Sequence, residues 1–144
     1  MYVLRNMVIS VKPGGLVLDL QVIRPDPRVE VDGRVVCKID GQPLFRLADA
    51  AAAAVDAAIA EGSLLEEAVD DHDVRKHYRT GEDLVADFAG KERKLPADAV
   101  PTVRALTRPC VVRERCRLRR LRTAAPASAT TKSPATSASS TASR

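Results

Sequence analysis

The stretch VKPGGLVLDL, residues 11–20, decides how the fold of this 144-residue chain is interpreted. Pro13 has a fixed φ angle and no amide hydrogen, so regular structure before it ends there. Gly14 and Gly15 tolerate positive φ angles, which a tight reversal of the chain needs. The apolar run that follows is bounded by turn residues and is too short for a helix. It predicts a strand buried on most of both faces, as in parallel sheets covered by helices.

The segment before this turn has a helical pattern. Its apolar residues recur at helical spacing, so Tyr2–Val11 is expected to form the last turns of a helix. Helix, turn and buried strand together make one step of a wound α/β sheet. Such a step normally has further strands on both sides.

The composition predicts one small folded unit, residues 1–122, followed by a tail. Residues 123–144 are mostly Ala, Ser, Thr and Pro without apolar periodicity, and we expect them to be disordered. Cys37, Cys110 and Cys116 form no CxxC pair and are interpreted as free, inert thiols in a reducing compartment. The sequence has neither a signal peptide nor a run of membrane-spanning length, so the cytoplasm is the expected location.

Turn and helix signals divide the middle of the chain. Asp32-Gly33 lies between two short alternating segments and predicts a small exposed hairpin inserted after the first strand. The alanine-rich segment Leu44–Glu61 predicts a helix that covers a sheet and ends at Gly62. The following segment, Leu64–Tyr78, is predicted to be a strand, although its alternation is poor for a buried one.

Two further elements precede the tail. Thr80 and Asp83 have the spacing of a capping box and predict a short helix that ends at Gly90, and a broken helix is expected after it. The segment 110–121 predicts a half-exposed strand with one apolar and one basic face. On the apolar face lie Cys110, Val112, Cys116 and Leu118, with Glu114 among them. The other face carries Val111, Arg113, Arg115, Arg117 and Arg119.

In this order the elements resemble the C-terminal half of a class I S-adenosylmethionine-dependent methyltransferase. In that family a helix ends in a Pro-Gly-Gly turn that opens the fifth strand, here VISVKPGGLVLDLQVI. The resemblance implies that Asp49–Glu61 is the crossover helix and Leu64–Tyr78 the sixth strand. It also implies that Cys110–Leu121 is an antiparallel seventh strand between the fifth and sixth. The fold class expected is therefore α/β, a partial Rossmann-like methyltransferase fold.

The resemblance implies that the cofactor-binding half of the family is absent. That half contains a glycine-rich loop and an acidic residue for the ribose, and such a loop works because its amides approach the ligand at a helix N-terminus. Gly14-Gly15 opens a strand instead. We therefore expect no cofactor-binding residues in this chain, name no catalytic residues, and expect S-adenosylmethionine only for an intact family member. A truncated gene, a misassigned start codon or a remnant would account for this.

Candidate site residues are few. His72 and His77 have no nucleophile beside them in the sequence, and we interpret them as solvated or structural. The neighbouring acidic residues Asp70, Asp71 and Asp73 are interpreted as surface acidity, because a metal site needs ligands from several elements. Asp19 interrupts an apolar run and is expected to be ion-paired or exposed at a sheet edge; a ligand-facing role in an intact family member is the alternative.

Three functions stay open. The first is a truncated methyltransferase that is inactive alone. The second is a non-catalytic interaction module, in which the open edge of the strand 15–23 pairs with a second copy or with a separate N-terminal half. The third is nucleic-acid binding through Arg113–Arg122, which is less favoured because aromatic stacking residues are absent and the net charge is only +4.

Overall fold

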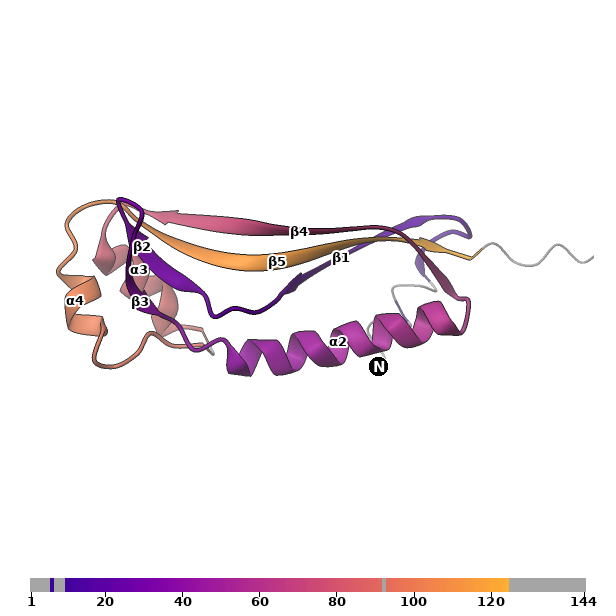
Figure 1. Cartoon of the computed structure of the whole chain (residues 1–144), viewed down its shortest axis with the longest axis horizontal. Helices are drawn as coiled ribbons and strands as arrows, with labels where there is room; N and C mark the ends of the chain where they lie inside the picture. The colour runs from indigo at the N-terminus through magenta and orange to yellow at the C-terminus, as the bar shows by residue number, and fades with distance from the viewer. Residues whose placement is uncertain (1–5, 7–9, 92, 125–144) are drawn as a thin grey trace, which may run out of the picture.

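The computed structural model describes residues 6, 10–91 and 93–124, and the structural statements below concern this part of the chain. It is a mixed α/β structure around a five-stranded sheet in which every pairing is antiparallel (Figure 1). The elements in chain order are β1 (Leu16–Val22), β2 (Arg28–Val31), β3 (Arg34–Lys38), α2 (Gln42–Ala60), β4 (Leu64–Tyr78), α3 (Gly81–Ala89), α4 (Val100–Arg104) and β5 (Cys110–Thr123).

The long strand β5 is the centre of the sheet. On one side β4 pairs with it over its whole length, from Leu64 opposite Thr123 to Tyr78 opposite Cys110. On the other side two strands share its length: β1 pairs with residues 116–122 and β2 with residues 111–113. The predicted strand is therefore confirmed as β5, and its neighbours pair with it on both edges.

The Pro-Gly-Gly segment forms a tight turn directly before β1. The Gly15 amide donates to the Lys12 carbonyl at 2.8 Å, and Gly14 has a φ of 73°, which together describe a type II turn with Pro13 at its second position. Gly15 is needed for a different reason. A Cβ atom there would lie 2.3 Å from Val11 Cγ1 and 2.7 Å from the Lys12 carbonyl oxygen.

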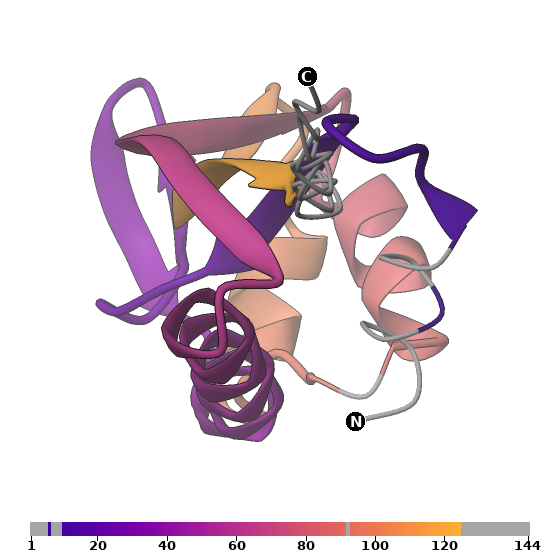
Figure 2. The same cartoon turned by 90° about the vertical axis from the view of Figure 1, so that its right-hand side faces the viewer.

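Helices cover opposite faces of the sheet at its two ends. Cys110 and Val112 belong to a core cluster under α3 and α4, whereas Leu121 packs with Val17 and with Val55 of α2. Because successive residues of a strand point to opposite faces, even-numbered and odd-numbered β5 residues lie on different faces. The end view shows α2 apart from α3 and α4 (Figure 2). Among the described residues, helices thus cover each face at one end only.

Most of the predicted middle elements are confirmed. Asp32 and Gly33 have φ angles of 50° and 78°, which suit a two-residue type I′ hairpin turn. The hairpin is not an exposed insertion, however, because β2 pairs with β5 and Val29 is fully buried. The predicted helix is α2. Its end is closed by Gly62 with positive φ and by a bond from the Ser63 amide to the Ala58 carbonyl at 3.0 Å.

The next two elements match the prediction closely. Strand β4 has the predicted bounds, and α3 begins with the Thr80–Asp83 capping box, in which each residue bonds the backbone amide of the other. The broken helix that was expected after α3 is the short helix α4.

The prediction that β1 is buried on most of both faces is wrong. Val17 is buried, but the alternate side chains Leu16, Leu18 and Leu20 are exposed. The apolar run predicts a strand correctly, yet no described element covers this face of it. In addition, β1 pairs with an antiparallel neighbour, not with a parallel one.

Both predicted terminal segments fall largely outside the described residues. Of the helix expected at Tyr2–Val11, three residues are described: Asn6 and Ser10 are helical, with a hydrogen bond of 2.8 Å from Ser10 Oγ to the Asn6 carbonyl, and Val11 lies in a bend after the helix. Of the expected tail, Thr123 belongs to β5 and the Ala124 amide bonds the Ser63 carbonyl. Residues 125–144 are not described. No helix in the described ranges has both the length and the apolar character to cross a membrane.

Candidate functional site

The amides of the Pro-Gly-Gly turn are used inside the chain. The Gly15 amide lies 3.0 Å from Thr123 Oγ1 as well as 2.8 Å from the Lys12 carbonyl, and the Gly14 amide donates to the Thr123 carbonyl at 3.1 Å. A loop that binds a phosphate or a dinucleotide has amides directed at the ligand and a helix behind it. This turn is followed by β1, and both glycine amides are bonded. It is a structural clamp between β1 and β5.

Asp19, expected to be ion-paired or exposed at a sheet edge, lies within β1 opposite Arg119 of β5; it forms no ion pair among the described residues and is only partly exposed. Arg119 instead bonds Asp56 of α2 at 2.8 Å and Glu66 of β4 at 2.5 Å. The Asp19 Oδ1 atom accepts from Gln21 Nε2 at 2.6 Å, and the Oδ2 atom is buried without a partner among the described residues. The sequence correctly indicated that this carboxylate is unusual, but it did not predict which residues surround it.

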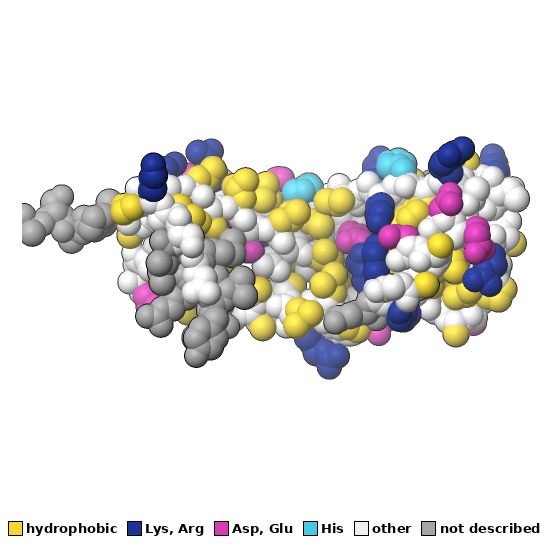
Figure 3. Space-filling view, turned by 180° about the vertical axis from the view of Figure 1, so that it is seen from behind, with side chains coloured by type: hydrophobic (Ala, Val, Ile, Leu, Met, Phe, Trp, Pro, Cys, Tyr) yellow, Lys and Arg dark blue, Asp and Glu magenta, His cyan; other side chains and the backbone are white. Residues whose placement is uncertain are grey.

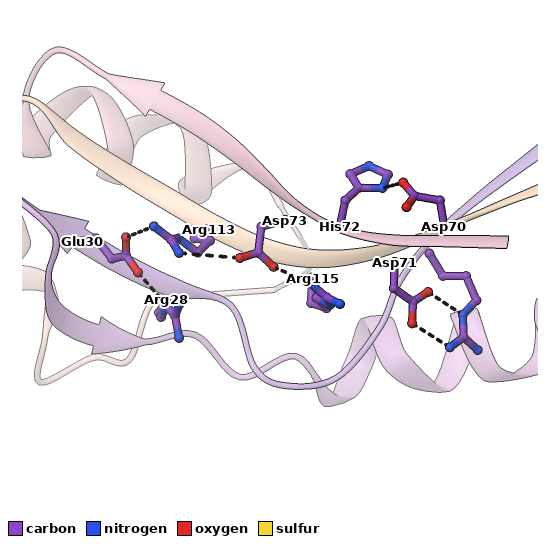
Figure 4. Close-up of polar contacts among 9 residues, drawn as sticks. Arg28, Glu30, Asp70, Asp71, His72, Asp73, Arg113 and Arg115 are labelled. Atoms are coloured by element: carbon purple, nitrogen blue, oxygen red, sulfur yellow. Dashed lines mark hydrogen bonds and ion pairs between the residues drawn. The ribbon is translucent and has the colours of Figure 1, made fainter.

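The arginines on the odd face of β5 form a chain of ion pairs with neighbouring strands (Figure 4). Arg113 lies between Glu30 of β2, at 3.1 Å, and Asp73 of β4, at 3.6 Å. Asp73 also contacts Arg115 at 3.3 Å, and Arg28 closes the other end by bonding Glu30 at 2.6 Å. Strand pairing places these residues on one face, because directly opposite residues of antiparallel strands share a face.

The remaining arginines of β5 are paired as well. Arg117 binds Asp71 through two hydrogen bonds of 2.7 and 2.8 Å, which hold the pKa of the Asp71 carboxyl below its usual value. Arg120 and Arg122 both contact Glu67, and the hydrogen bond from Arg122 is the main cause of the lowered pKa of Glu67.

Six arginines of β5 thus contact six carboxylates. The arginines are residues 113, 115, 117, 119, 120 and 122, and the carboxylates are Glu30, Asp56, Glu66, Glu67, Asp71 and Asp73. These carboxylates come mostly from β4 and β2, with one residue from a helix. The acidic residues of β4 are a signal in the sequence for these ion pairs.

The histidines and their acidic neighbours do not form a catalytic or metal-binding group in the described part of the chain. His72 Nδ1 lies 2.8 Å from Asp70, and both side chains are exposed. Asp71 and Asp73 point to the other face and bind arginines (Figure 4). Within the described ranges no cluster of three or more His, Cys, Asp or Glu side chains could hold a metal ion.

The three cysteines are free thiols. Burial is the main cause that raises the pKa of Cys37, Cys110 and Cys116 above the ordinary thiol value, and nearby carboxylates add to it. Since the thiolate is the reactive form, these residues are kept in their unreactive state. The Cys110 thiol donates to the Thr80 carbonyl at 3.7 Å and packs in the core.

An open pocket of about 320 Å³ lies beside the start of α2 and is lined by Pro43, Leu44, Lys91 and Arg93. Its two cations already have partners. Lys91 Nζ bonds Asp87 at 2.6 Å, and Arg93 bonds Glu114. The first amide of α2, that of Gln42, donates to Asp40 at 2.9 Å. Lys91 and the helix end are therefore satisfied by the chain itself, whereas Arg93 Nη1 is buried without a hydrogen-bond partner among the described residues.

One face of β1 exposes apolar side chains that no described element packs against. Leu16, Leu18 and Leu20 are 46%, 57% and 57% exposed and lie on one face, and β1 pairs with a strand on one edge only in the described part of the molecule. Hydrophobic side chains reach the surface at several neighbouring places in the space-filling view (Figure 3). Contiguous exposed apolar surface of this kind marks contact with another molecule or another part of a chain.

Comparison of the sequence with protein-family models gives no match, and neither curated proteins nor solved structures match it.

Proposed function

We propose that this chain supplies the C-terminal half of a class I S-adenosylmethionine-dependent methyltransferase fold and does not bind the cofactor by itself. The observation that supports the proposal is the order of three strands. β5 lies between β1 and β4 and is antiparallel to both, so β1 and β4 are parallel to each other. The resemblance in the sequence implies this order for the fifth, seventh and sixth strands of the family.

Two further features agree with that assignment. The Pro-Gly-Gly turn opens β1, as the family pattern implies for the fifth strand. Helix α2 precedes β4 and packs against the odd face of the sheet through Val55, which contacts Val17 of β1 and Leu64 of β4. The β2–β3 hairpin is then an insertion between the fifth strand and the crossover helix.

The chemistry implied for the complete fold is methyl transfer to a nucleophile. The bond between the methyl carbon and the sulfonium sulfur breaks as the nucleophile bonds that carbon, the electron pair returns to sulfur, and the nucleophile loses a proton. The reaction depends largely on in-line positioning of donor and acceptor. In this chain the glycine amides are engaged by Thr123, so its part in the proposal is to complete the sheet.

The test is titration calorimetry with S-adenosylmethionine on two proteins. The first is the chain alone, for which we expect no saturable binding at micromolar cofactor. The second is a fusion in which residues 10–124 follow the first four strands of a small class I methyltransferase, for which we expect binding. Saturable binding by the chain alone would contradict its dependence on another half. A fusion that melts cooperatively but excludes the cofactor would contradict the assignment to this family.

A second candidate function is a non-catalytic interaction module that docks through β1. The exposure of Leu16, Leu18 and Leu20 beside an edge that pairs with no other described strand favours it. Replacing Leu18 and Leu20 by Thr keeps strand propensity and removes apolar surface. We expect this double variant to lose concentration-dependent association driven by β1 without losing folding stability. Unchanged association would exclude this surface.

A further inference from the structure

We propose that the outer edge of β4 pairs with β4 of a second copy of this chain, antiparallel and about a two-fold axis at Val74. This goes beyond the proposed function and does not depend on it, because β4 lies on the opposite side of β5 from β1. The result would be one continuous sheet across two copies.

The first observation is the length and openness of the edge. Strand β4 has 15 residues and pairs with β5 alone in the described part of the chain. Between Leu65 and His77 every side chain is exposed or only partly buried. A strand edge of this length offers a row of unpaired amide and carbonyl groups to another strand.

The second observation is the separation of charge along β4. Within residues 70–78, the part of β4 that an axis at Val74 pairs, the half before Val74 carries Asp70, Asp71 and Asp73, and the half after it carries Arg75 and Lys76. Charges on an edge strand usually repel unwanted strands. When they are separated by sign, an antiparallel copy of the same strand meets opposite charges, whereas a parallel copy meets like charges. The charge pattern therefore selects a second copy in one orientation.

Backbone geometry restricts the register further. In an antiparallel pair, opposite residues both direct their amide and carbonyl groups toward the partner strand or both direct them away, and these two types alternate. The residues that direct these groups to one edge of a strand are therefore every second residue. Two copies of the same strand can then pair only even-numbered with even-numbered and odd-numbered with odd-numbered residues, so the two-fold axis passes between the two copies of one residue. An axis at Asp73 or Arg75 sets two like charges directly opposite, and an axis at His72 sets Asp71 opposite Asp73. An axis at Val74 sets Asp73 opposite Arg75 twice.

The two side chains of this pairing can accept a new contact. Among the described residues Arg75 makes no ion pair. Asp73 contacts Arg113 and Arg115 at 3.6 and 3.3 Å, longer than the 2.7 Å between Arg117 and Asp71, and its side chain is 33% exposed. Asp73 would then lie between arginines of β5 and Arg75 of the second copy, all on the odd face.

The first test is sedimentation equilibrium of the chain and of Arg75→Asp over a range of concentrations. We expect a dimer whose dissociation constant rises with salt and rises about tenfold or more in the variant, since two attractive pairs become repulsive. The matched control is Arg34→Asp, an exposed arginine on the edge strand β3, which should leave the constant unchanged. A monomer at every concentration, or a dimer insensitive to Arg75→Asp, would overturn the proposal.

The second test fixes the register by oxidative cross-linking in a Cys37→Ser background. At a two-fold axis the two Val74 residues have Cα atoms about 4.5–5.5 Å apart, within reach of a disulfide. Val74→Cys should therefore cross-link rapidly. Val69→Cys is the control, because it is also an exposed valine of β4 but lies opposite Arg79 of the second copy in this register. Cross-linking of Val69→Cys and not of Val74→Cys would overturn the proposed axis.

Discussion

Thr123 ties the end of β5 to the turn that begins β1. Its hydroxyl oxygen accepts a hydrogen bond from the Gly15 amide at 3.0 Å and donates to the Lys12 carbonyl at 2.9 Å, while its own amide bonds the Gly15 carbonyl at 3.0 Å. The side chain is buried, so these groups have no water to replace the lost bonds. Two segments 108 residues apart are thereby held in register.

Replacing Thr123 by Val keeps the shape of the side chain and removes both hydroxyl bonds. We expect Thr123→Val to lower the free energy of unfolding by about 0.5–1.5 kcal/mol, because the Gly15 amide and the Lys12 carbonyl lose their bonds to the hydroxyl but keep the bond to each other. Urea denaturation measures this. Thr123→Ser, which retains the hydroxyl, should lose less. Equal losses in the two variants would mean that packing of the methyl group, not hydrogen bonding, stabilises the turn.

Asp87 of α3 should make the fold sensitive to acid. Its carboxylate accepts from Lys91 at 2.6 Å, Tyr78 at 2.6 Å and Lys76 at 2.9 Å, and these bonds hold its pKa well below the usual value. A carboxyl with a lowered pKa in the folded state stabilises the fold above its unfolded pKa, about 4, and this contribution is lost as the pH falls toward the folded value.

The corresponding variant is Asp87→Asn. We expect it to be less stable than the original chain at neutral pH and to show a flatter loss of stability below about pH 4. Denaturation across pH measures both effects. The exposed Asp98→Asn is the control and should leave the profile unchanged. If the profile of Asp87→Asn stayed as steep as that of the original chain, other carboxylates would account for the acid sensitivity.

Tyr78 should lose its phenol proton at a higher pH than an ordinary tyrosine. Burial, and next the hydrogen bond to Asp87, raise the pKa of Tyr78 to about 12. Since the folded pKa is raised, the neutral phenol stabilises the fold below its unfolded pKa, about 10, and this contribution is lost as the pH rises through the folded value. Near-ultraviolet titration of tyrosinate, with Tyr78→Phe subtracted, measures it. Asp87→Asn should shift the midpoint downward, and an ordinary midpoint in the original chain would show that Tyr78 is not protected.

Local signals in the sequence were sufficient for most elements. The Asp32-Gly33 dipeptide predicts the hairpin, Gly62 predicts the end of α2, and the Thr80–Asp83 box predicts the start of α3, because each is a backbone requirement met within a few residues. Strand β4 was predicted in spite of its poor alternation of apolar and polar residues. The alternation is poor because one edge and most of its side chains face solvent.

Relations between distant strands could not be predicted in the same way. The apolar run of β1 predicts burial on both faces, but burial depends on whether another element lies against Leu18, which no local pattern states. The partners of Arg117 and Arg119 lie 46 and 53 residues away on β4 and become neighbours only through pairing with β5. Likewise Thr123, which resembles the first residue of the polar tail, acts through contacts 108 residues distant.

The ion pairs on β5 lead to a prediction about nucleic acid. Because each of its six arginines contacts a carboxylate, we expect little salt-dependent binding to short single-stranded DNA or RNA. Removing carboxylates should expose the arginines. The triple variant Glu67→Gln, Asp71→Asn and Asp73→Asn raises the net charge from +4 to +7, since three negative charges are lost. It should bind more tightly and with a steeper dependence on salt, as measured by fluorescence anisotropy.

A matched triple variant separates this local effect from net charge. Glu61→Gln, Glu82→Gln and Asp98→Asn make the same change of charge at exposed positions away from β5, and we expect a smaller gain in affinity from them. Equal gains would show that only total charge matters. Tight binding by the original chain that is lost in Arg115→Gln and Arg117→Gln would mean that the arginines reach phosphates in spite of their carboxylate partners. It would then favour nucleic acid as the ligand of this face of the sheet.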